Sequence, residues 1–298
     1  MAITHKGSAA PDVQKKTEAL REQIRRHEYR YYVLDDPEIN DAEFDLLMNE
    51  LKKLEAMHPE LVTADSPTQR VGGKPKEGFA KVRHSRPMLS LDNAYNEEEL
   101  RDWERRVHEL TGRAEVEYVC ELKLDGMSMA LTYSAGHFER GVTRGDGETG
   151  EEVTSNVRTM RSVPLSISAK VLKQAGLPPE FEARGEVIMP LAEFQRMNEE
   201  REQEGLSKFA NPRNAAAGSV RVLEPNIVAQ RRLDFYSYQL LANGAEVFPT
   251  HHEALDALLA AGFKVNPHRV LTAKLDEVLK FIGKMEPYTL SLHDALPI

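Results

Sequence analysis

The stretch Cys120-Glu121-Leu122-Lys123-Leu124-Asp125-Gly126 decides how the rest of the chain is interpreted. Its residues alternate between apolar and charged, and successive side chains of a β-strand point to opposite faces. We therefore expect a strand with Glu121, Lys123 and Asp125 on one face and the apolar residues on the other. Most short alternating segments are half-buried strands with a solvated charged face, and that interpretation stays open here.

Lys123 is also a candidate nucleophile. Gly126, which follows the charged triplet, lets the backbone approach another group closely or turn sharply. An ordinary lysine has a pKa of about 10.4, so presenting its neutral amine at pH 7 costs about 4.6 kcal/mol. Flanking carboxylates raise that cost, whereas burial or a nearby cation lowers it. A basic partner or a metal ion must therefore lie near Lys123 when a substrate is bound.

The string Lys-x-Asp-Gly resembles the adenylation motif of the covalent nucleotidyltransferases, which are the DNA ligases, RNA ligases and capping enzymes. Residues 121–126 are followed by residues 143–159, which read TRGDGETGEEVTSNVRT, and together they resemble the bacterial NAD-dependent DNA ligases. The resemblance covers about residues 13–287. It implies an α+β protein with a small N-terminal helical hairpin domain, residues 1–72, and a mainly antiparallel-sheet nucleotidyltransferase domain of ATP-grasp-like form, residues 73–298.

Composition describes an ordinary soluble globular protein of 298 residues, 41% hydrophobic and 29% charged. No long apolar run could span a membrane and the start has no signal-peptide core, so we expect a cytoplasmic protein without membrane contact, and a monomer. The formal net charge of -9 argues against coating nucleic acid by bulk charge. The single cysteine, Cys120, excludes an internal disulfide and a cysteine-rich zinc site, and we expect it to be buried and inert.

Two helices are expected near the N-terminus, after a mobile lead over residues 1–12. The first runs from about Val13 to about Asp35. The second begins near Asn40 or Asp41, where Glu43 can complete a capping box, and buries a set of apolar side chains. The spacing gives this set as Phe44, Leu47, Met48, Leu51 and Leu54.

The resemblance implies that this hairpin binds the nicotinamide mononucleotide (NMN) half of NAD. Tyr31, Asp41 and Asp45 fall on the matching positions, with an aromatic ring to stack on nicotinamide and carboxylates to bond polar groups. Tyr32 stands where histidine is common and Phe44 where tyrosine is common. Packing for the tyrosines and helix-dipole stabilisation for the aspartates remain alternative interpretations.

Residues 59–81 contain several proline and glycine residues and are interpreted as a linker. The segment 84–93 that follows resembles the ligase segment beside the adenine pocket, which makes Ser90 and Leu91 candidates for adenosine contact; an ordinary strand entrance is the alternative. A helix capped by Asn96 and Glu99 is expected next. Its core-facing residues would be Leu100, Trp103, Val107 and Leu110.

After the central strand we expect a second strand to Tyr133 and a tight turn at residues 134–136. Residues 145–150 match the dinucleotide fingerprint G-x-G-x-x-G. However, acidic neighbours would repel a pyrophosphate, and no acidic residue stands near Lys170 to hold a ribose. We therefore reject a Rossmann site. Arg144 is the useful residue, because it can hold a phosphate near Lys123. Glu186, on a strand expected over 181–189, resembles the nucleotide-contacting glutamate of the family, although a surface ion-pair face is the usual explanation.

The best basic patch in this acidic chain is formed by Lys208, Arg213 and Arg221, which suit phosphates of DNA or nucleotide. Beyond it the pattern predicts a strand (235–241), a helix (251–261), a strand (263–265) and a helix (274–285). The histidines show no metal-ligand spacing with carboxylates, so no protein metal site is expected. Residues 288–298 no longer resemble the family, which makes the adenylation domain incomplete and these residues a non-native tail.

The resemblance implies a reaction in which Lys123 attacks NAD, carries AMP and releases NMN, with Mg²⁺ shielding the pyrophosphate linkage. AMP would then pass to the 5′-phosphate of nicked double-stranded DNA. Asp125 would position the lysine or a ribose hydroxyl, Glu121 would contact adenine, and Arg144 and Glu186 would hold the phosphate and ribose sides. We expect impaired activity of this chain. A catalytically inactive NAD- or NMN-binding module, and a nucleotidyltransferase that uses ATP or GTP, are the alternatives.

Overall fold

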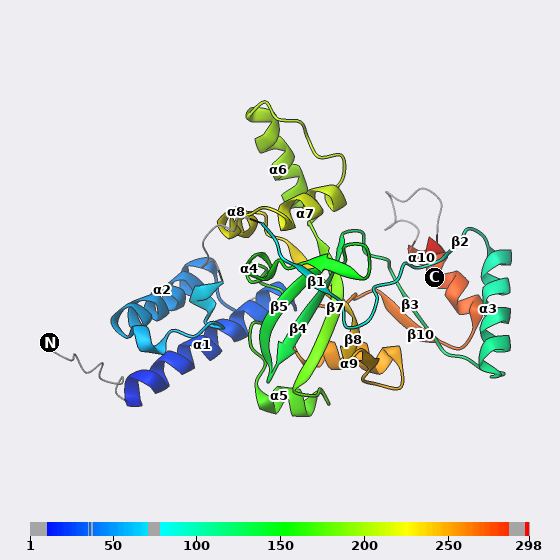
Figure 1. Ribbon diagram of the computed structural model, residues 1–298, viewed down its shortest axis with the longest axis horizontal. Coiled ribbons are helices and arrows are strands. Elements are labelled where there is room, and N and C mark those ends of the chain that lie inside the picture. Colours follow the sequence, from blue (N-terminus) through cyan, green and yellow to red (C-terminus); the bar gives the residue numbers. More distant parts are fainter. Residues whose placement is uncertain (1–10, 35, 37, 71–77, 286–295, 298) are drawn as a thin grey trace.

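The computed structural model describes residues 11–34, 36, 38–70, 78–285 and 296–297. Figure 1 shows a helical hairpin at one end of the molecule, the helices α3 (Glu97–Thr111) and α10 (Leu275–Met285) at the other, and the central sheet between them. Helices and antiparallel sheets occur in one chain, with the helical part first. This arrangement confirms the expected α+β class.

The hairpin consists of α1 (Pro11–Tyr32) and α2 (Asp41–Met57). Asn40 accepts a hydrogen bond from the amide of Glu43, and the Glu43 side chain accepts one from the Asn40 amide, so the expected capping box is present. Helix α1 begins at Pro11, inside the lead expected over residues 1–12; residues 1–10 lie outside the described residues. The core of the hairpin is formed by Leu20, Ile24, Met48 and Leu51, with Phe44, Leu47 and Leu54 packed against it.

Residues 59–70 of the segment interpreted as a linker pack on the hairpin. They form the 3₁₀ turns η1 (Pro59–Leu61) and η2 (Pro67–Gln69), and the Ser66 hydroxyl donates to the Glu55 carboxylate at 2.6 Å. Arg21 donates to the same carboxylate at 2.7 Å, and both of these side chains are buried. A buried carboxylate needs such partners, which explains why the chain continues along the hairpin here.

The central sheet has five strands in the order β5-β4-β7-β8-β9, all antiparallel. The strands are β4 (Met127–Ser134), β5 (His137–Thr143), β7 (Glu180–Ile188), β8 (Asp234–Ala242) and β9 (Ala245–Glu246). The expected hairpin turn joins β4 to β5, with Ala135 and Gly136 at φ values of 47° and 81°. Positive φ at both positions is the requirement of the tightest antiparallel turns.

The two faces of this sheet differ in chemistry. Met129, Leu131 and Tyr133 of β4 point into the main core, where the ring of Tyr133 stacks on Phe181 at 4.8 Å. The opposite face carries polar and charged side chains from β4 and β7, because side chains alternate along a strand. The core side is completed by α4 (Thr154–Val157), α5 (Ala169–Gln174), α6 (Leu191–Gln203), α7 (Pro212–Val220), α8 (Pro225–Gln230) and α9 (His251–Ala260).

Three two-stranded ribbons surround the central sheet. They pair β1 (Lys81–Arg83) with β6 (Thr149–Glu151), β2 (Asn93–Ala94) with β11 (Leu296–Pro297), and β3 (Tyr118–Glu121) with β10 (Arg269–Thr272). Most of the expected tail, 288–298, lies outside the described residues.

Two expectations about individual elements were wrong in detail. Residues 263–265 do not form a strand: Phe263 and Val265 are buried by side-chain packing, and the strand forms later, as β10. In α3, Leu100 is buried beside Leu275 of α10, whereas Leu110 is 87% exposed. Among the described residues, the cluster between α3 and α10 includes Leu100 and Trp103 from the first turns of α3 and not Leu110 from its last turn.

One arginine joins the hairpin to the sheet domain. The buried Arg70 donates to the carbonyl oxygens of Met160 and Val163 at 3.1 and 3.2 Å, and to the buried carboxylate of Glu28 on α1 at 3.1 Å. Arg161 adds a contact of 3.4 Å to Glu28. The bonds of Arg70 to these two carbonyls connect the parts, and its desolvated ion pair with Glu28 is costly to break from one side.

We expect Arg70→Ala to lower the free energy of unfolding by about 3 to 5 kcal/mol, because it leaves the Glu28 carboxylate buried with a weaker partner. Urea unfolding followed by far-UV circular dichroism measures this. The control is Arg26→Ala, which removes a pair with Glu38 at 2.9 Å from a side chain that is 65% exposed and should cost less than about 1 kcal/mol. Equal losses in the two variants would contradict the inferred role of the buried pair.

Candidate active site

Lys123 lies in a loop and not on a strand. Strand β3 ends at Glu121, where its ladder with β10 ends, and β4 begins at Met127. The prediction of a continuous strand through residue 126 was therefore wrong: beyond Glu121 no neighbouring strand pairs with the backbone. We call residues 122–126 the lysine loop; Lys123 is exposed within it.

The end of the lysine loop is fixed by a close approach between backbones. A Cβ atom on Gly126 would lie 2.0 Å from the carbonyl oxygen of Val187 on β7, so only glycine fits there. Of the two expected uses of Gly126, close approach is the one found. Its amide also acts to lower the pKa of Glu186, against the rise that burial causes.

Three side chains from distant segments hold the rest of the loop. His251, at the start of α9, lies 2.8 Å from the Glu121 carboxylate, and the Asn266 amide donates to the carbonyl of Leu122 at 2.6 Å. Arg213 of α7 donates to Asp125 at 3.2 Å. The lysine loop is thus anchored on both sides of Lys123.

Glu186 lies on the charged face of the sheet, directly opposite Ser128 of β4. The Ser128 hydroxyl donates to its carboxylate at 2.8 Å, and the residue is only 8% exposed. Burial raises the pKa of Glu186, while the hydrogen bond from Ser128 and the positive charges of Lys123 and Arg213 oppose that rise. The structure therefore brings Lys123, Glu186 and Arg213 into one electrostatic neighbourhood, as the sequence predicted for the first two.

A strap over residues 84–93 crosses the charged face and meets Arg144. The Arg144 guanidinium donates to the Met88 carbonyl at 3.2 Å and to the Ser90 hydroxyl at 2.9 Å. The expected phosphate and adenosine residues are thus in contact with each other. Leu91, the other candidate for adenosine contact, is 60% exposed.

The strap is held down by Arg184, which is only 2% exposed. Its guanidinium donates to the carbonyl oxygens of Arg86 and Pro87 at 2.5 and 3.2 Å and to Glu182 at 2.6 Å. Arg184 and Glu186 stand on the same face of β7, because side chains alternate along a strand. One strand therefore supplies both the carboxylate near Lys123 and the anchor of the strap.

Tyr238 of β8 interacts both with the Glu186 side of the site and with the arginines that contact the strap. Burial raises the pKa of its phenol and so does the charge of Glu186, while Ser128, Arg184 and Arg144 act in the opposite direction. Tyr238, Ser128, His251 and Asn266 were not identified from the sequence. Their place depends on strand register and on contacts between distant segments; the one signal was the position of Ser128, two residues after Gly126.

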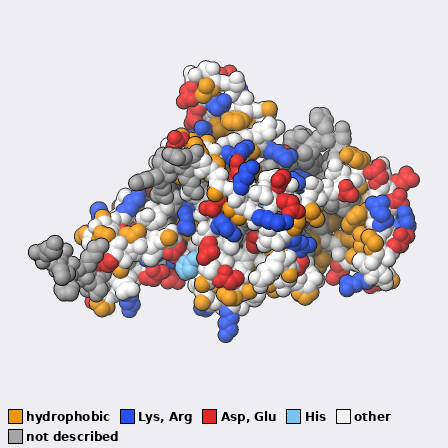
Figure 2. All heavy atoms as spheres, in the orientation of Figure 1, with side chains coloured by type: hydrophobic (Ala, Val, Ile, Leu, Met, Phe, Trp, Pro, Cys, Tyr) orange, Lys and Arg blue, Asp and Glu red, His pale blue; other side chains and the backbone are white. Residues whose placement is uncertain are grey.

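The expected basic patch does not exist as a cluster of free charges. Each of its three members forms an ion pair with a carboxylate: Lys208 with Glu202, Arg213 with Asp125 and Arg221 with Glu151. Figure 2 shows Lys and Arg side chains interspersed with Asp and Glu on the visible face, without a continuous basic surface.

The G-x-G-x-x-G segment forms a turn that leads into β6. Gly145 and Gly147 have φ values of 59° and 98°, and Asp146 accepts hydrogen bonds from the amides of Glu148 and Thr149 at 2.9 and 2.7 Å. These bonds lower the pKa of Asp146. Because a strand and not a helix follows directly, the rejection of a Rossmann site is confirmed.

The residues expected to bind NMN lie on the hairpin. Tyr31 is 47% exposed and Asp45 is exposed; the side chains of Tyr32 and Asp41 lie outside the described residues. In Figure 1 the hairpin and the β3-β10 ribbon lie on opposite sides of the central sheet. The structure therefore does not bring the two expected halves of the NAD site together.

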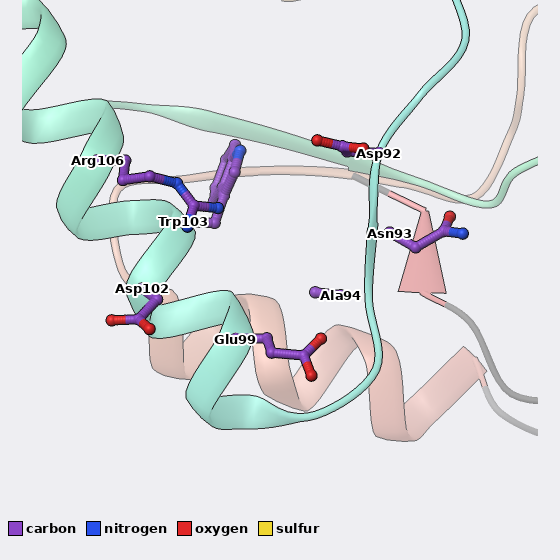
Figure 3. Close-up of a pocket in the computed structure, with 7 residues that line it drawn as sticks. All are labelled: Asp92, Asn93, Ala94, Glu99, Asp102, Trp103 and Arg106. Carbon is purple, nitrogen blue, oxygen red and sulfur yellow. The ribbon is translucent and has the colours of Figure 1, made fainter.

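A small pocket of about 120 Å³ lies beyond the strap, between β2 and α3 (Figure 3). Its lining is Asp92, Asn93, Ala94, Glu99, Asp102, Trp103 and Arg106, and contains no residue expected in the site.

Cys120 is half-buried, and burial raises the pKa of its thiol, which fits an inert cysteine. Among the described residues, no group of three or more His, Cys, Asp or Glu could hold a metal, and no helix could cross a membrane.

Replacing Glu186 with glutamine should stabilise the protein at neutral pH. The raised pKa means that the unfolded state loses this proton first as pH rises. Above the ordinary glutamate pKa of about 4.3, the wild type therefore loses stability relative to Glu186→Gln. Thermal melting at about pH 4 and at about pH 7 measures the difference.

The matched control is Glu180→Gln on the same strand, where an exposed carboxylate accepts from Ser134 of β4 at 2.6 Å. This substitution should change the free energy of unfolding by less than about 0.5 kcal/mol at either pH. A Glu186→Gln variant that is no more stable than wild type near pH 7 would refute the electrostatic account.

Comparison with known proteins gives two family matches that together cover nearly the whole chain. Residues 76–293 match the NAD-dependent DNA ligase adenylation domain, and residues 10–72 match the DNA ligase-like, N-terminal NAD⁺-binding domain. These descriptions confirm the resemblance drawn from the sequence, and they confirm NAD as its cofactor.

Curated relatives named DNA ligase agree with this. The chain is 64% identical over 279 residues to that of Koribacter versatilis, 63% over 276 residues to that of Acidobacterium capsulatum and 54% over 275 residues to that of Thermotoga petrophila. The alignments cover 94%, 92% and 92% of this chain but 42%, 41% and 39% of the relatives. The chain therefore spans about 40% of their length. Because the adenylation-domain match extends over well more than half of its residues, the chain belongs to the family of NAD-dependent DNA ligases.

Proposed function

We propose that this chain performs the adenylation step of NAD-dependent DNA ligation. The Lys123 amine attacks the α-phosphorus of NAD; a phosphorus–nitrogen bond forms, the pyrophosphate bond to NMN breaks, and the lysine releases its proton. The single observation that carries the proposal is the neighbourhood of an exposed Lys123 with the buried Glu186, in a loop held by side chains from three other segments. Such anchoring is what a positioned nucleophile requires.

The neighbours of Lys123 take distinct roles in this proposal. Glu121, fixed by His251, contacts adenine, and Asp125 positions the lysine or a ribose hydroxyl. Arg144 holds the phosphate side, and Glu186 the ribose side. Arg213, which donates to Asp125, supplies a cation beside the lysine loop that can meet the phosphate.

Adenosine would be bound at the strap by Ser90 and Leu91, next to Arg144. The NMN half would be bound by the hairpin, through Tyr31, Tyr32, Asp41 and Asp45. We further propose the domain division at residues 1–72 and 73–298; the two family matches, 10–72 and 76–293, support it.

Mg²⁺ would be carried mainly by the phosphates of the nucleotide. The described residues hold no carboxylate cage, and Mg²⁺ commonly binds through substrate phosphates with one or two carboxylates. When bound, it would neutralise charge on the pyrophosphate as NMN leaves. We assign no protein ligand to it.

AMP would next pass to the 5′-phosphate of nicked double-stranded DNA, and a 3′-hydroxyl would displace it to seal the nick, as in replication and repair. Lys208, Arg213 and Arg221 remain the proposed phosphate contacts. Their carboxylate partners are exposed to solvent in part, and exchanging a surface ion pair for a phosphate contact costs little. We propose that the protein acts as a cytoplasmic monomer and that this chain has impaired activity.

A binding module without catalysis is the second candidate. The observation in its favour is that Asp125 and Glu186 both lie near Lys123, because carboxylates hold an amine in its protonated, unreactive form. In that case NAD would bind and no covalent adduct would form.

Lys123→Ala should abolish covalent AMP labelling, because no other amine stands in the lysine loop. Intact-mass spectrometry after incubation with NAD and Mg²⁺ measures the adduct, with ATP in place of NAD to test the alternative cofactor. Lys173→Ala, on α5, should label like the wild type. An adduct that survives Lys123→Ala would refute the nucleophile, and one formed with ATP would refute the cofactor.

Asp45→Asn should weaken NAD binding by about 10-fold, the cost of roughly one charge-assisted hydrogen bond. Titration calorimetry with NAD measures the affinity. Asp12→Asn, in the first turn of α1, is the control on the same hairpin and should bind like the wild type. Equal affinity in all three proteins would contradict the proposed NMN contact.

A further inference from the structure

A buried amide stands next to the proposed nucleophile. Asn266 is only 4% exposed, and its Nδ2 donates to the carbonyl oxygen of Leu122 at 2.6 Å across 144 residues of sequence. Its Oδ1 accepts a hydrogen bond from the amide of His268 at 2.9 Å. Both ends of the side-chain amide are therefore satisfied.

This pair of bonds fixes which way the amide points. An asparagine has one acceptor oxygen and one donor NH₂ group. Because the oxygen is committed to the His268 amide, the NH₂ group must face Leu122. The Asn266–Leu122 hydrogen bond therefore lies directly beyond Arg269–Glu121, the last pair of the ladder between β3 and β10.

The bonded carbonyl belongs to the peptide unit that joins Leu122 to Lys123. A peptide unit is planar, so fixing its oxygen also fixes the direction in which the Cα atom of Lys123 lies. His251 holds the preceding residue, Glu121, from the start of α9, and Asn266 follows α9 in the chain. The segment from His251 to Asn266 therefore contacts the two consecutive residues that precede the lysine.

We propose that Asn266 is a positioning residue for Lys123, acting through the carbonyl of Leu122. The inference rests on the proposed adenylation function, because it assigns Asn266 to the geometry of that step. A displacement of about 1 Å in a reacting group can cost about 100-fold in rate. Loss of the Asn266 bond should therefore slow adduct formation without changing how NAD binds.

Asn266→Asp is the sharpest test, because it keeps the shape and replaces the donor NH₂ with an oxygen that repels the Leu122 carbonyl. Asn266→Ala removes the donor without adding a charge, in case the aspartate variant does not fold. The matched control is Asn156→Asp. Asn156 is 1% exposed and donates to the carbonyls of Val220 and Val222 at 2.7 Å each, far along the chain from the lysine loop.

Two measurements on the full chain separate positioning from general stability. Hydrogen–deuterium exchange of peptides covering residues 119–127 should be faster in both Asn266 variants and unchanged in Asn156→Asp. The rate of AMP-adduct formation at saturating NAD should fall by about 10- to 100-fold in the Asn266 variants, at an unchanged half-saturating NAD concentration. Asn156→Asp should lose thermal stability, but the fraction of it that is folded should form the AMP adduct at the wild-type rate.

Exchange in the lysine loop that matches wild type in both Asn266 variants would overturn the proposal. So would a rate loss that is equal in the Asn266 and Asn156 variants. If the wild-type chain forms no adduct with NAD, the proposed function of this chain fails, and the exchange result alone then decides whether Asn266 holds the loop.

Discussion

The antiparallel pairing of β4 with β7 is the constraint on which the whole site depends. Its register sets Ser128 against Glu186 and Met127 against Val187. The first pair places a buried carboxylate under a hydroxyl; the second brings the Gly126 backbone against the Val187 carbonyl. A slip of β4 by one residue would turn Ser128 toward the apolar core and Met127 away from it, and both pairs would be lost. The geometry near Lys123 is therefore a property of the sheet more than of the loop.

The charges in this neighbourhood are balanced in a particular way. Glu186 is buried enough for its pKa to rise, and Lys123 and Arg213 counter that rise. Arg213 is in turn engaged by Asp125, the second carboxylate of the motif. An incoming phosphate would compete with Asp125 for Arg213. The anion that the chain is proposed to bind is thereby linked to the charges around the proposed nucleophile.

Sequence patterns were sufficient where a local rule decides the structure. The capping box at Asn40 and Glu43 and the turn after β4 follow from chemistry within a few residues. They were insufficient where the partner is distant. Alternation predicted a strand through the lysine loop, but a strand also needs a neighbour, and the ladder with β10 ends at Glu121.

The same limit explains the other differences. Phe263 and Val265 alternate like a strand, yet side-chain burial alone accounts for the pattern. His251 and Asn266 gave no signal, because their partners are 130 and 144 residues away. The basic patch was predicted from charge in sequence order, whereas the fold places a carboxylate beside each cation.

The grip of Arg184 on the strap has a consequence for how this site can vary. Its guanidinium holds the carbonyl oxygens of residues 86 and 87, which every amino acid supplies. The bonds from Arg184 therefore do not depend on the side chains at those two positions, although the Arg86 side chain adds an exposed ion pair with Glu246 at 2.9 Å. Exchanges there that suit the local backbone should cost little stability. Arg184 itself has no such freedom, since lysine lacks the planar fork that spans two carbonyls. The residue that holds the strap lies on β7, about a hundred residues away in the sequence. Substitutions within the strap therefore leave this anchor unchanged.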